Sequence, residues 1–261
     1  MNDSHPLLDL QNITVARGNN LALNCFSLKI AAGEHVCILG PNGSGKSTLI
    51  KTITRECYPL ANEGASMSIL GRFAWNIFEL RPLLGIVSPD LLAACTNDSS
   101  CLDVVLSGFF SSIGLQPYHQ VTPAMEDKAD QVIDLLKIGH LRGRWLAELS
   151  SGEARRVVIG RALVHSPLAL LLDEPANSLD LFAMQELRQS IRTLAQGGIG
   201  IVLITHHLPD LIPEIERVIF LKDGRILADG PKAELLTAEK LSGLFCVSVQ
   251  LIQRDGYFHI C

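Results

Sequence analysis

Hydrophobic and polar residues alternate along the beginning of the chain, which is the pattern of β-strands with one buried face. The alternation covers residues 8–15 and 22–30, and a short apolar segment follows at 36–39. Gly18 and Gly33 separate these segments, as turn residues do between strands. The pattern predicts a β-rich N-terminal subdomain.

Hydrophobic positions recur at helical spacing between about residues 90 and 150. Thr122 is suited to cap a helix, and Pro123 to occupy its first position, because proline lacks the N–H that a helix start leaves unpaired. The apolar face then comprises Val132, Ile133, Leu135 and Leu136. We expect an inserted helical subdomain in this part of the chain.

Two continuous apolar segments, at residues 168–172 and 199–204, flank a helical pattern at 180–195. Apolar strands on both sides of a helix are typical of a βαβ unit, whose parallel strands are buried on both faces. The predicted fold class is therefore α/β with a mostly parallel core sheet.

The last part of the chain, residues 217–261, carries short strand patterns. They lie at 218–221, 225–228, 247–252 and 257–260, and Asp-Gly pairs occur between them. Because Asp-Gly favours tight turns, this C-terminal tail predicts a small terminal β-layer with two hairpins.

Composition fits one globular domain over residues 1–261. Of the 261 residues, 48% are hydrophobic and 19% charged, which is enough apolar material for a full core. The net charge is -5 and no run of Lys or Arg occurs. A general nucleic-acid binder needs a basic face to neutralise phosphates, so the sequence gives no strong nucleic-acid signal.

Cysteine usage and hydropathy bear on the compartment. The seven cysteines are odd in number and scattered, with no C-x-x-C pair, so neither a disulfide framework nor a zinc site is indicated. They are Cys25, Cys37, Cys57, Cys95, Cys101, Cys246 and Cys261. We expect cytoplasmic thiols. No signal-peptide pattern and no apolar run of about 18 residues is present, so a membrane role requires a partner.

A glycine-rich segment follows the apolar residues 36–39 and leads into a helical pattern. It consists of Gly40, Pro41, Asn42, Gly43, Ser44, Gly45, Lys46, Ser47 and Thr48. Glycines allow several backbone N–H groups to point at one phosphate, Lys46 adds a positive charge, and Ser47 offers a hydroxyl ligand to Mg²⁺. The alternative is a glycine-rich turn before a helix. The spacing favours a phosphate-binding loop for a nucleoside triphosphate.

Two acids, Asp173 and Glu174, come directly after the apolar segment 168–172. Ligands collect at the carboxyl ends of strands in open α/β sheets. Asp173 is placed to hold Mg²⁺, and Glu174 to polarise an attacking water. The alternative is a solvated turn, and the phosphate-binding loop favours the catalytic interpretation.

Ser150, Ser151, Gly152 and Glu153 precede a further helical pattern. Ser150 and Glu153 have the spacing of a capping box. The same helix start, with a hydroxyl and a bare glycine, is also an anion receptor. Because residues 40–48 already cradle a phosphate, we expect this receptor to serve a phosphate presented by another copy.

The order of these segments resembles the ATP-binding cassette (ABC) ATPase family over most of the chain. The matching segments are 40–48, the signature-like 149–153, 168–174, the D-loop-like 178–180 with Asp180, and Thr205-His206. The resemblance implies a Mg²⁺-dependent ATPase in which two cassettes pair head to tail. It assigns Ser150 and Gly152 to the partner's ATP, and His206 to the γ-phosphate.

Three departures from the family pattern stand out. Arg17 occupies the position of the family's adenine-stacking aromatic, and a guanidinium plane can also stack on a ring. The family's Q-loop glutamine is missing from residues 85–90, which we expect to form a loop with Asp90 as the candidate oxygen ligand for the metal. The alternative is a plain turn at Ser88, Pro89 and Asp90 after a strand. The signature reads Ser-Ser-Gly-Glu instead of Ser-Gly-Gly-Gln.

The resemblance implies a single-cassette subunit of a transporter, of a subgroup similar to molybdate-type ATP-binding proteins. Such a subunit dimerises around ATP, drives an integral membrane permease and lies on the cytoplasmic face of the membrane. The alternative is a soluble ABC ATPase acting on ribosomes or nucleic acid. Those relatives usually carry two cassettes or a long coiled-coil insertion. A binding module without turnover is disfavoured by Glu174 and His206.

Overall fold

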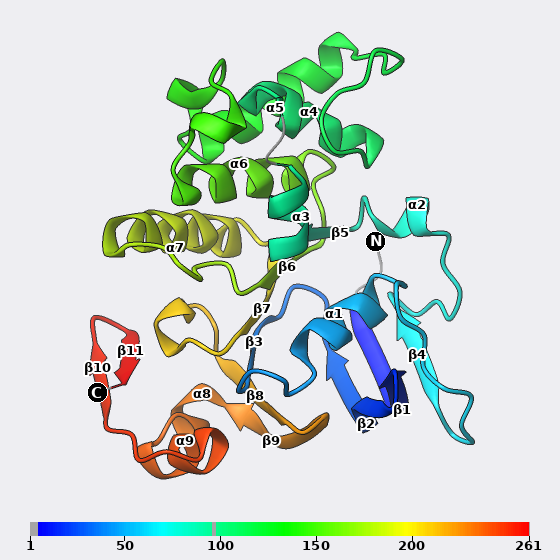
Figure 1. Ribbon diagram of the computed structural model, residues 1–261, viewed down its shortest axis with the longest axis vertical. Coiled ribbons are helices and arrows are strands. Elements are labelled where there is room, and N and C mark those ends of the chain that lie inside the picture. Colours follow the sequence, from blue (N-terminus) through cyan, green and yellow to red (C-terminus); the bar gives the residue numbers. More distant parts are fainter. Residues whose placement is uncertain (1–4, 96–97, 261) are drawn as a thin grey trace. The chain divides into compact units, whose positions relative to one another are not determined.

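The computed structural model describes residues 5–95 and 98–260, and Cys261 lies outside them. The chain forms two compact units (Figure 1). Unit 1 joins the segments Met1–Ile77 and Gly200–Cys261, and unit 2 is the continuous segment Phe78–Ile199 between them. No helix among the described residues is both long and apolar enough to cross a membrane.

Unit 1 begins with an antiparallel sheet of order β2-β1-β4. β1 spans Leu8–Arg17, β2 spans Asn20–Ile30 and β4 spans Ser66–Ile69. In β2, Phe26, Leu28 and Ile30 are buried and the residues between them are exposed, as the alternation requires. The predicted strands at 8–15 and 22–30 are confirmed.

The core of unit 1 is a sheet segment of order β7-β3-β8-β9. β3 (His35–Leu39) pairs in parallel with both β7 (Gly200–Thr205) and β8 (Arg217–Lys222). β9 (Arg225–Pro231) pairs with β8 in the antiparallel sense. The middle of β3 and all of β7 are buried, which explains their unbroken apolar sequences.

The C-terminal tail is only partly what the sequence predicts. Both hairpins form, β8–β9 and the pair β10 (Leu251–Arg254) and β11 (Tyr257–Ile260). The expectation of a separate terminal layer is wrong for the first hairpin, because β8 joins the core sheet beside β3. Two helices, α8 (Lys232–Leu235) and α9 (Ala238–Phe245), lie between the hairpins.

Unit 2 is mainly helical around the parallel pair β5 (Leu84–Val87) and β6 (Ala169–Asp173). Its longer helices are α4 (Cys101–Ser107), α5 (Pro123–Leu135), α6 (Ser151–Leu163) and α7 (Leu181–Gln196). Short ones are α2 (Ile77–Leu80) at the junction of the units and α3 (Pro89–Ala94). The predicted cap of α5 is confirmed, since the Thr122 hydroxyl accepts the Met125 N–H.

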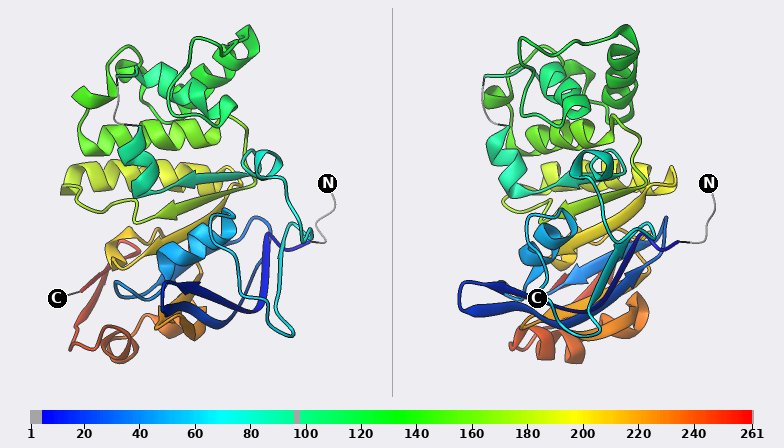
Figure 2. Two further views of the ribbon diagram at one scale, coloured as in Figure 1. Left: turned by 45° about the vertical axis from the view of Figure 1, so that its right-hand side comes forward. Right: turned by 90° about the vertical axis from the view of Figure 1, so that its right-hand side faces the viewer.

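Helix α6 is the centre of unit 2. It packs against α3, α4, α5, α7 and β5, and Figure 2 shows it stacked beside α7. Gly108 follows α4 where a Cβ would come 2.3 Å from the Arg161 carbonyl oxygen, so glycine is required for this approach. The start of α6 and the loop after β6 both belong to unit 2.

Candidate functional site

Two glycines of the phosphate-binding loop, Gly40 and Gly45, are required by their surroundings in unit 1. The loop connects β3 to α1 (Lys46–Ile53). A Cβ on Gly40 would lie 2.1 Å from the Leu221 carbonyl oxygen. A Cβ on Gly45, whose φ is +110°, would lie 2.4 Å from the Ala22 carbonyl oxygen. No other residue fits at these two positions, as a backbone cradle for an anion requires.

Lys46 turns its side chain back into this loop. The Lys46 Nζ atom donates to the carbonyl oxygens of Gly40, at 2.7 Å, and Pro41, at 3.0 Å, and only 6% of the residue is exposed. The Ser44 hydroxyl is buried near Gly40 and has no hydrogen-bond partner among the described residues. Ser47 is exposed at the start of α1. The loop thus holds an ammonium and a buried hydroxyl that match phosphate oxygens.

Other strands of unit 1 hold the loop in shape. The Gly40 N–H donates to the Thr205 carbonyl at the end of β7, at 3.2 Å. The Gly224 N–H donates to the Ser44 carbonyl at 2.9 Å. The Asn24 N–H of β2 in turn donates to the Gly224 carbonyl at 2.9 Å. Residues far apart in sequence therefore determine the conformation of residues 40–48.

His206 is the first residue after β7, so the structure brings it and the phosphate-binding loop to the carboxyl ends of adjacent strands in unit 1. His206 is partly buried and His207 is exposed, with their ring centroids 5.4 Å apart. The ring of His207 therefore lies at the surface. The contact of His206 with the γ-phosphate stays a prediction.

Arg17 is exposed at the last position of β1, paired with Asn20 across the hairpin turn. Its position is compatible with a surface contact, and adenine stacking stays a prediction.

Unit 2 contributes the two acids after β6. Asp173 is the last residue of the strand and is 9% exposed, and Glu174 is partly exposed. The backbone of Glu174 has a φ of +47°, which is uncommon for a residue with a side chain. Such backbone strain concentrates at functional sites, where surrounding contacts maintain it.

The contact that maintains this turn comes from Arg155 on α6. The guanidinium donates to the carbonyl oxygens of Glu174, at 3.3 Å, Pro175 and Asn177. The planar fork of arginine suits several acceptors at once. The sequence predicts a helix that carries Arg155, but it has no signal for this contact, because the contact joins residues about 20 positions apart.

The signature-like segment forms the start of α6, and the capping box is confirmed. The Glu153 carboxylate accepts hydrogen bonds from the backbone N–H and the hydroxyl of Ser150, both at 2.8 Å. These bonds hold the pKa of Glu153 below its usual value. Ser150 and Ser151 are exposed, so the helix start remains accessible.

Gly152 sets the distance between two helix starts. A Cβ on Gly152 would lie 2.6 Å from the Ala183 Cβ on α7. Asp180 caps α7, since its Oδ1 atom accepts the Ala183 N–H at 2.8 Å. The signature-like segment and the D-loop-like segment therefore meet within unit 2.

The segment in place of the Q-loop is not the loop that the sequence suggests. Ser88 caps α3 by accepting the Leu91 N–H at 3.2 Å, and Pro89 is the first residue of that helix. Asp90 follows in the first helical turn and is exposed. Proline without an N–H and an acidic residue both favour a helix start, which accounts for the difference. The metal-binding role of Asp90 stays a prediction.

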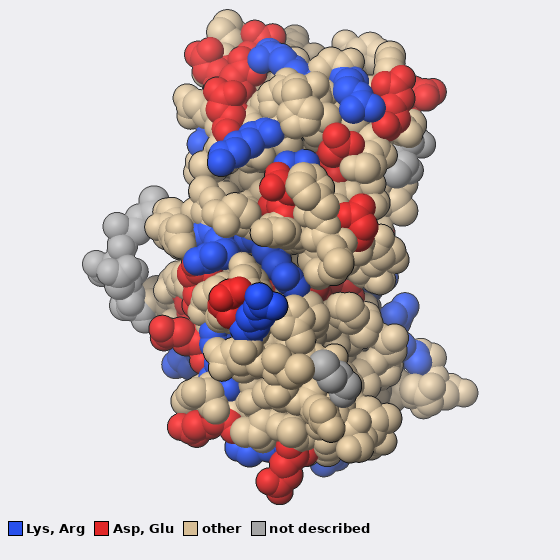
Figure 3. Space-filling view, turned by 90° about the vertical axis from the view of Figure 1, so that its left-hand side faces the viewer, with Lys and Arg blue, Asp and Glu red and all other residues tan. Residues whose placement is uncertain are grey.

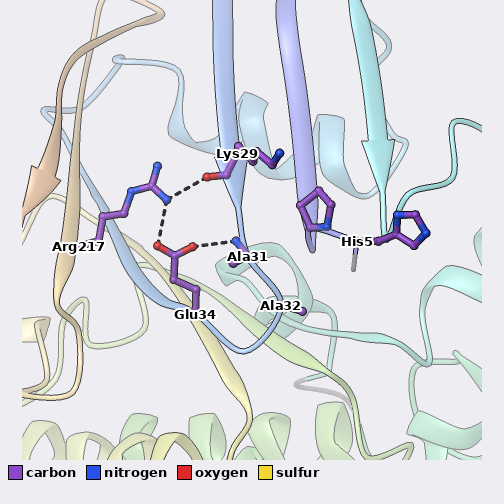
Figure 4. A pocket seen from close by; sticks show the side chains of 7 residues that line it. His5, Lys29, Ala31, Ala32, Glu34 and Arg217 are labelled. Carbon is purple, nitrogen blue, oxygen red and sulfur yellow. Dashed lines mark hydrogen bonds and ion pairs between the residues drawn. The ribbon is translucent and has the colours of Figure 1, made fainter. Parts of the chain in front are cut away.

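An open hollow of about 580 Å³ in unit 1 is not the nucleotide site (Figure 4). Arg217 and Glu34 line it at the amino ends of β8 and β3, whereas residues 40–48 follow the carboxyl end of β3. Arg217 donates to Glu34, at 2.9 Å, and to both carboxylate oxygens of Asp229, at 2.6 and 2.7 Å. The arginine is thereby committed to structural contacts.

Comparisons with known proteins agree with this geometry. The sequence profile of the ABC transporter family matches residues 23–177. The ABC transporter ATP-binding protein YlmA of Bacillus subtilis (strain 168) is 30% identical over 94% of this chain and 93% of its own length. The ABC transporter ATP-binding protein ModF of Escherichia coli (strain K12) is 32% identical over 85% of this chain and 46% of its own length. The dimeric structure of the ATP-binding cassette MJ0796 bound to ADP and Pi has a TM-score of 0.69 and 26% identity, covering 86% of this chain and 98% of that one.

Proposed function

This chain belongs to the ABC transporter family, and on that premise we propose that it is an ATP-binding and ATP-hydrolysing subunit that dimerises around ATP to drive an integral membrane partner. The observation that carries the proposal is the phosphate-binding loop, where Gly40 and Gly45 leave no room for a Cβ and Lys46 points inward. A loop of this form fits the phosphates of a nucleotide.

The hydrolytic chemistry is assigned to Ser47 and His206 of unit 1 and to Asp173 and Glu174 of unit 2. Ser47 and Asp173 have the hard oxygen ligands that Mg²⁺ prefers, and the metal would neutralise phosphate charge when bound. Glu174 would accept a proton from the attacking water, because its carboxylate follows a buried strand in a turn that Arg155 holds. His206 would donate a hydrogen bond to the γ-phosphate.

Dimerisation is proposed from the accessible start of α6. Ser150 and Ser151 are exposed at this helix start, which offers hydroxyl and backbone N–H groups to an anion, whereas Gly152 is buried behind them. ATP bound to one copy would supply a phosphate to the other, and Asp180 would lie beside the shared site. The dimeric cassette with ADP and Pi supports this arrangement.

A transporter role is favoured over a soluble one acting on ribosomes or nucleic acid. The match to YlmA covers 93% of a protein named as a transporter ATP-binding subunit. On the face drawn in Figure 3, Lys and Arg alternate with Asp and Glu in small clusters and uncharged surface dominates. A nucleic-acid partner would require a continuous basic area. Location on the cytoplasmic face, through the membrane partner, follows from the same proposal.

The molybdate-type subgroup has only loose support. ModF is similar to this chain over less than half of the ModF length.

The test is ATP hydrolysis by the purified chain with and without Mg²⁺. Wild type should release phosphate only with the metal, and Glu174→Gln should keep ATP binding and lose turnover, since only water activation is removed. Glu126→Gln, the same chemical change at an exposed position of α5, is the control. Wild-type turnover by Glu174→Gln would refute the assignment of the base.

A further inference from the structure

The residue before His206 and an acid four residues after it are joined by a buried hydrogen bond. The Thr205 hydroxyl donates to the Asp210 Oδ2 atom at 2.5 Å, and these residues are 0% and 3% exposed. A bond of this length from a hydroxyl to a carboxylate is of the strong, charge-assisted kind. We infer that Thr205 and Asp210 are positioning residues that set the place of His206, an inference that rests on the proposed role of His206.

The direction of this bond determines what Thr205 can do next. A hydroxyl has one proton, and Thr205 donates it to the carboxylate of Asp210, which as an ionised group can accept hydrogen bonds but not donate them. The lone pairs of the hydroxyl are thereby left to accept the His207 N–H, at 2.9 Å. Asp210 thus fixes the orientation in which Thr205 holds the peptide after His206.

The peptide before His206 is held as well. The Thr205 carbonyl accepts the N–H of Gly40, the first residue of the phosphate-binding loop, at 3.2 Å. His206 therefore stands between two peptide groups that are both fixed through Thr205. One of them is tied directly to the loop whose phosphate His206 would contact.

The loop after His206 is closed from its other end and covered. The Asp210 N–H donates to the His207 carbonyl at 3.1 Å, within the short 3₁₀ turn η4 (Leu208–Asp210). β11 packs against η4, and the hairpin turn at Gly256 approaches Pro213. These elements all belong to unit 1. The carboxylate of Asp210 is therefore confined to one place, as a positioning group must be.

The competing explanation is that the bond only stabilises unit 1. A purely structural bond would affect stability, and its loss would lower turnover by the same factor whether or not His206 is present. A positioning bond acts through the imidazole, so its loss should matter only while His206 is there. A double-mutant cycle separates the two explanations.

The experiment measures kcat, ATP affinity and thermal unfolding for Thr205→Val, alone and combined with His206→Ala. Thr205→Val should lower kcat about tenfold to a hundredfold, as small misplacements of reacting groups do, with ATP affinity within about twofold of wild type. On the His206→Ala background it should have no further effect. Thr205→Ser, which keeps the hydroxyl, should restore kcat.

Thr54→Val is the matched control. It removes another threonine hydroxyl that donates to a carboxylate, that of Glu56, at 2.8 Å. It should leave kcat unchanged. If Thr205→Val does not fold, Asp210→Asn replaces it in the double-mutant cycle. The side-chain NH₂ of the asparagine can donate to the Thr205 hydroxyl, so the direction of the hydrogen bond would be reversed.

The outcomes separate this inference from the function it rests on. Wild-type turnover by His206→Ala would overturn both the role of His206 and its positioning. The inference alone would be overturned if His206→Ala caused a large loss of kcat and Thr205→Val lowered kcat by the same factor in the wild type and in His206→Ala. The proposed role of His206 would then stand.

Discussion

The guanidinium of Arg155 donates to the main-chain carbonyl of Glu174 over 3.3 Å, so a side chain on α6 holds the turn that carries the proposed base. The same guanidinium reaches the carbonyls of Pro175 and Asn177. The backbone of Glu174 has a positive φ, and these hydrogen bonds from one guanidinium help to maintain it.

Replacing Arg155 should therefore impair turnover through the position of Glu174. Arg155→Ala should lower kcat at least about tenfold and reduce thermal stability, because the three main-chain carbonyls lose their donor. Arg155→Lys should recover part of the stability and little of kcat, because a point charge cannot replace a planar fork. The control is Arg142→Ala, which breaks an exposed ion pair with Asp130 and should change stability by less than about 0.5 kcal/mol. Normal kcat in Arg155→Ala would contradict this account.

Gly45→Ala should abolish nucleotide binding. The new Cβ would lie 2.4 Å from the Ala22 carbonyl oxygen, at a backbone φ of +110°. Gly64→Ala is the matched control, because Gly64 also has a positive φ, +76°, but nothing within 4 Å of the Cβ position. The control should cost about 1–2 kcal/mol in stability and keep binding. Fluorescent ATP titration and thermal unfolding would measure both effects, and equal behaviour of the two variants would show that the clash is unimportant.

Asp180 allows a structural role to be separated from a functional one. Asp180→Ala should cost about 1 kcal/mol, because the Ala183 N–H loses its cap, and lower the melting temperature by about 2–4 °C. Asp180→Asn should keep the cap and the melting temperature. If the D-loop role is right, Asp180→Asn should still lower turnover. Wild-type turnover in Asp180→Asn would restrict Asp180 to capping.

Glu153 predicts a pH-dependent part of the stability. Its pKa in the folded chain is lowered by hydrogen bonds from Ser150, so its contribution is present above its ordinary pKa of 4.5 and is lost as the pH falls through the folded value. Glu153→Gln keeps the capping geometry without the charge. Wild type should melt above Glu153→Gln at pH 7, and the difference should shrink toward pH 3. A difference that does not vary with pH would contradict the prediction.

Local patterns in the sequence were sufficient for the elements that carry the chemistry. The alternation in β2 and the apolar run in β3 predicted strands, because each pattern reflects which residues of that strand are buried. The cap residue Thr122 placed the start of α5 because capping depends on neighbours three residues away. The phosphate-binding loop and the acids after β6 follow from the same kind of local signal.

Features that depend on distant partners could not be predicted. The contact of Arg155 with the turn after β6, and the pairing of β8 with β3, join residues separated by many positions. β4 and β5, at four residues each, are too short for a clear period. The helix that begins at Pro89 has only six residues, which is too short for a clear helical period.

The pairing of β3 between β7 and β8 also sets an order of events during protein synthesis. β3 is made early, but both of its neighbours and the Gly224 amide that supports Ser44 come after residue 199. Unit 2 is continuous in sequence and leaves the ribosome complete before them. The nascent chain should therefore form its helical unit first and acquire a nucleotide-binding loop only near the end of translation, so chains released early should fail to bind ATP.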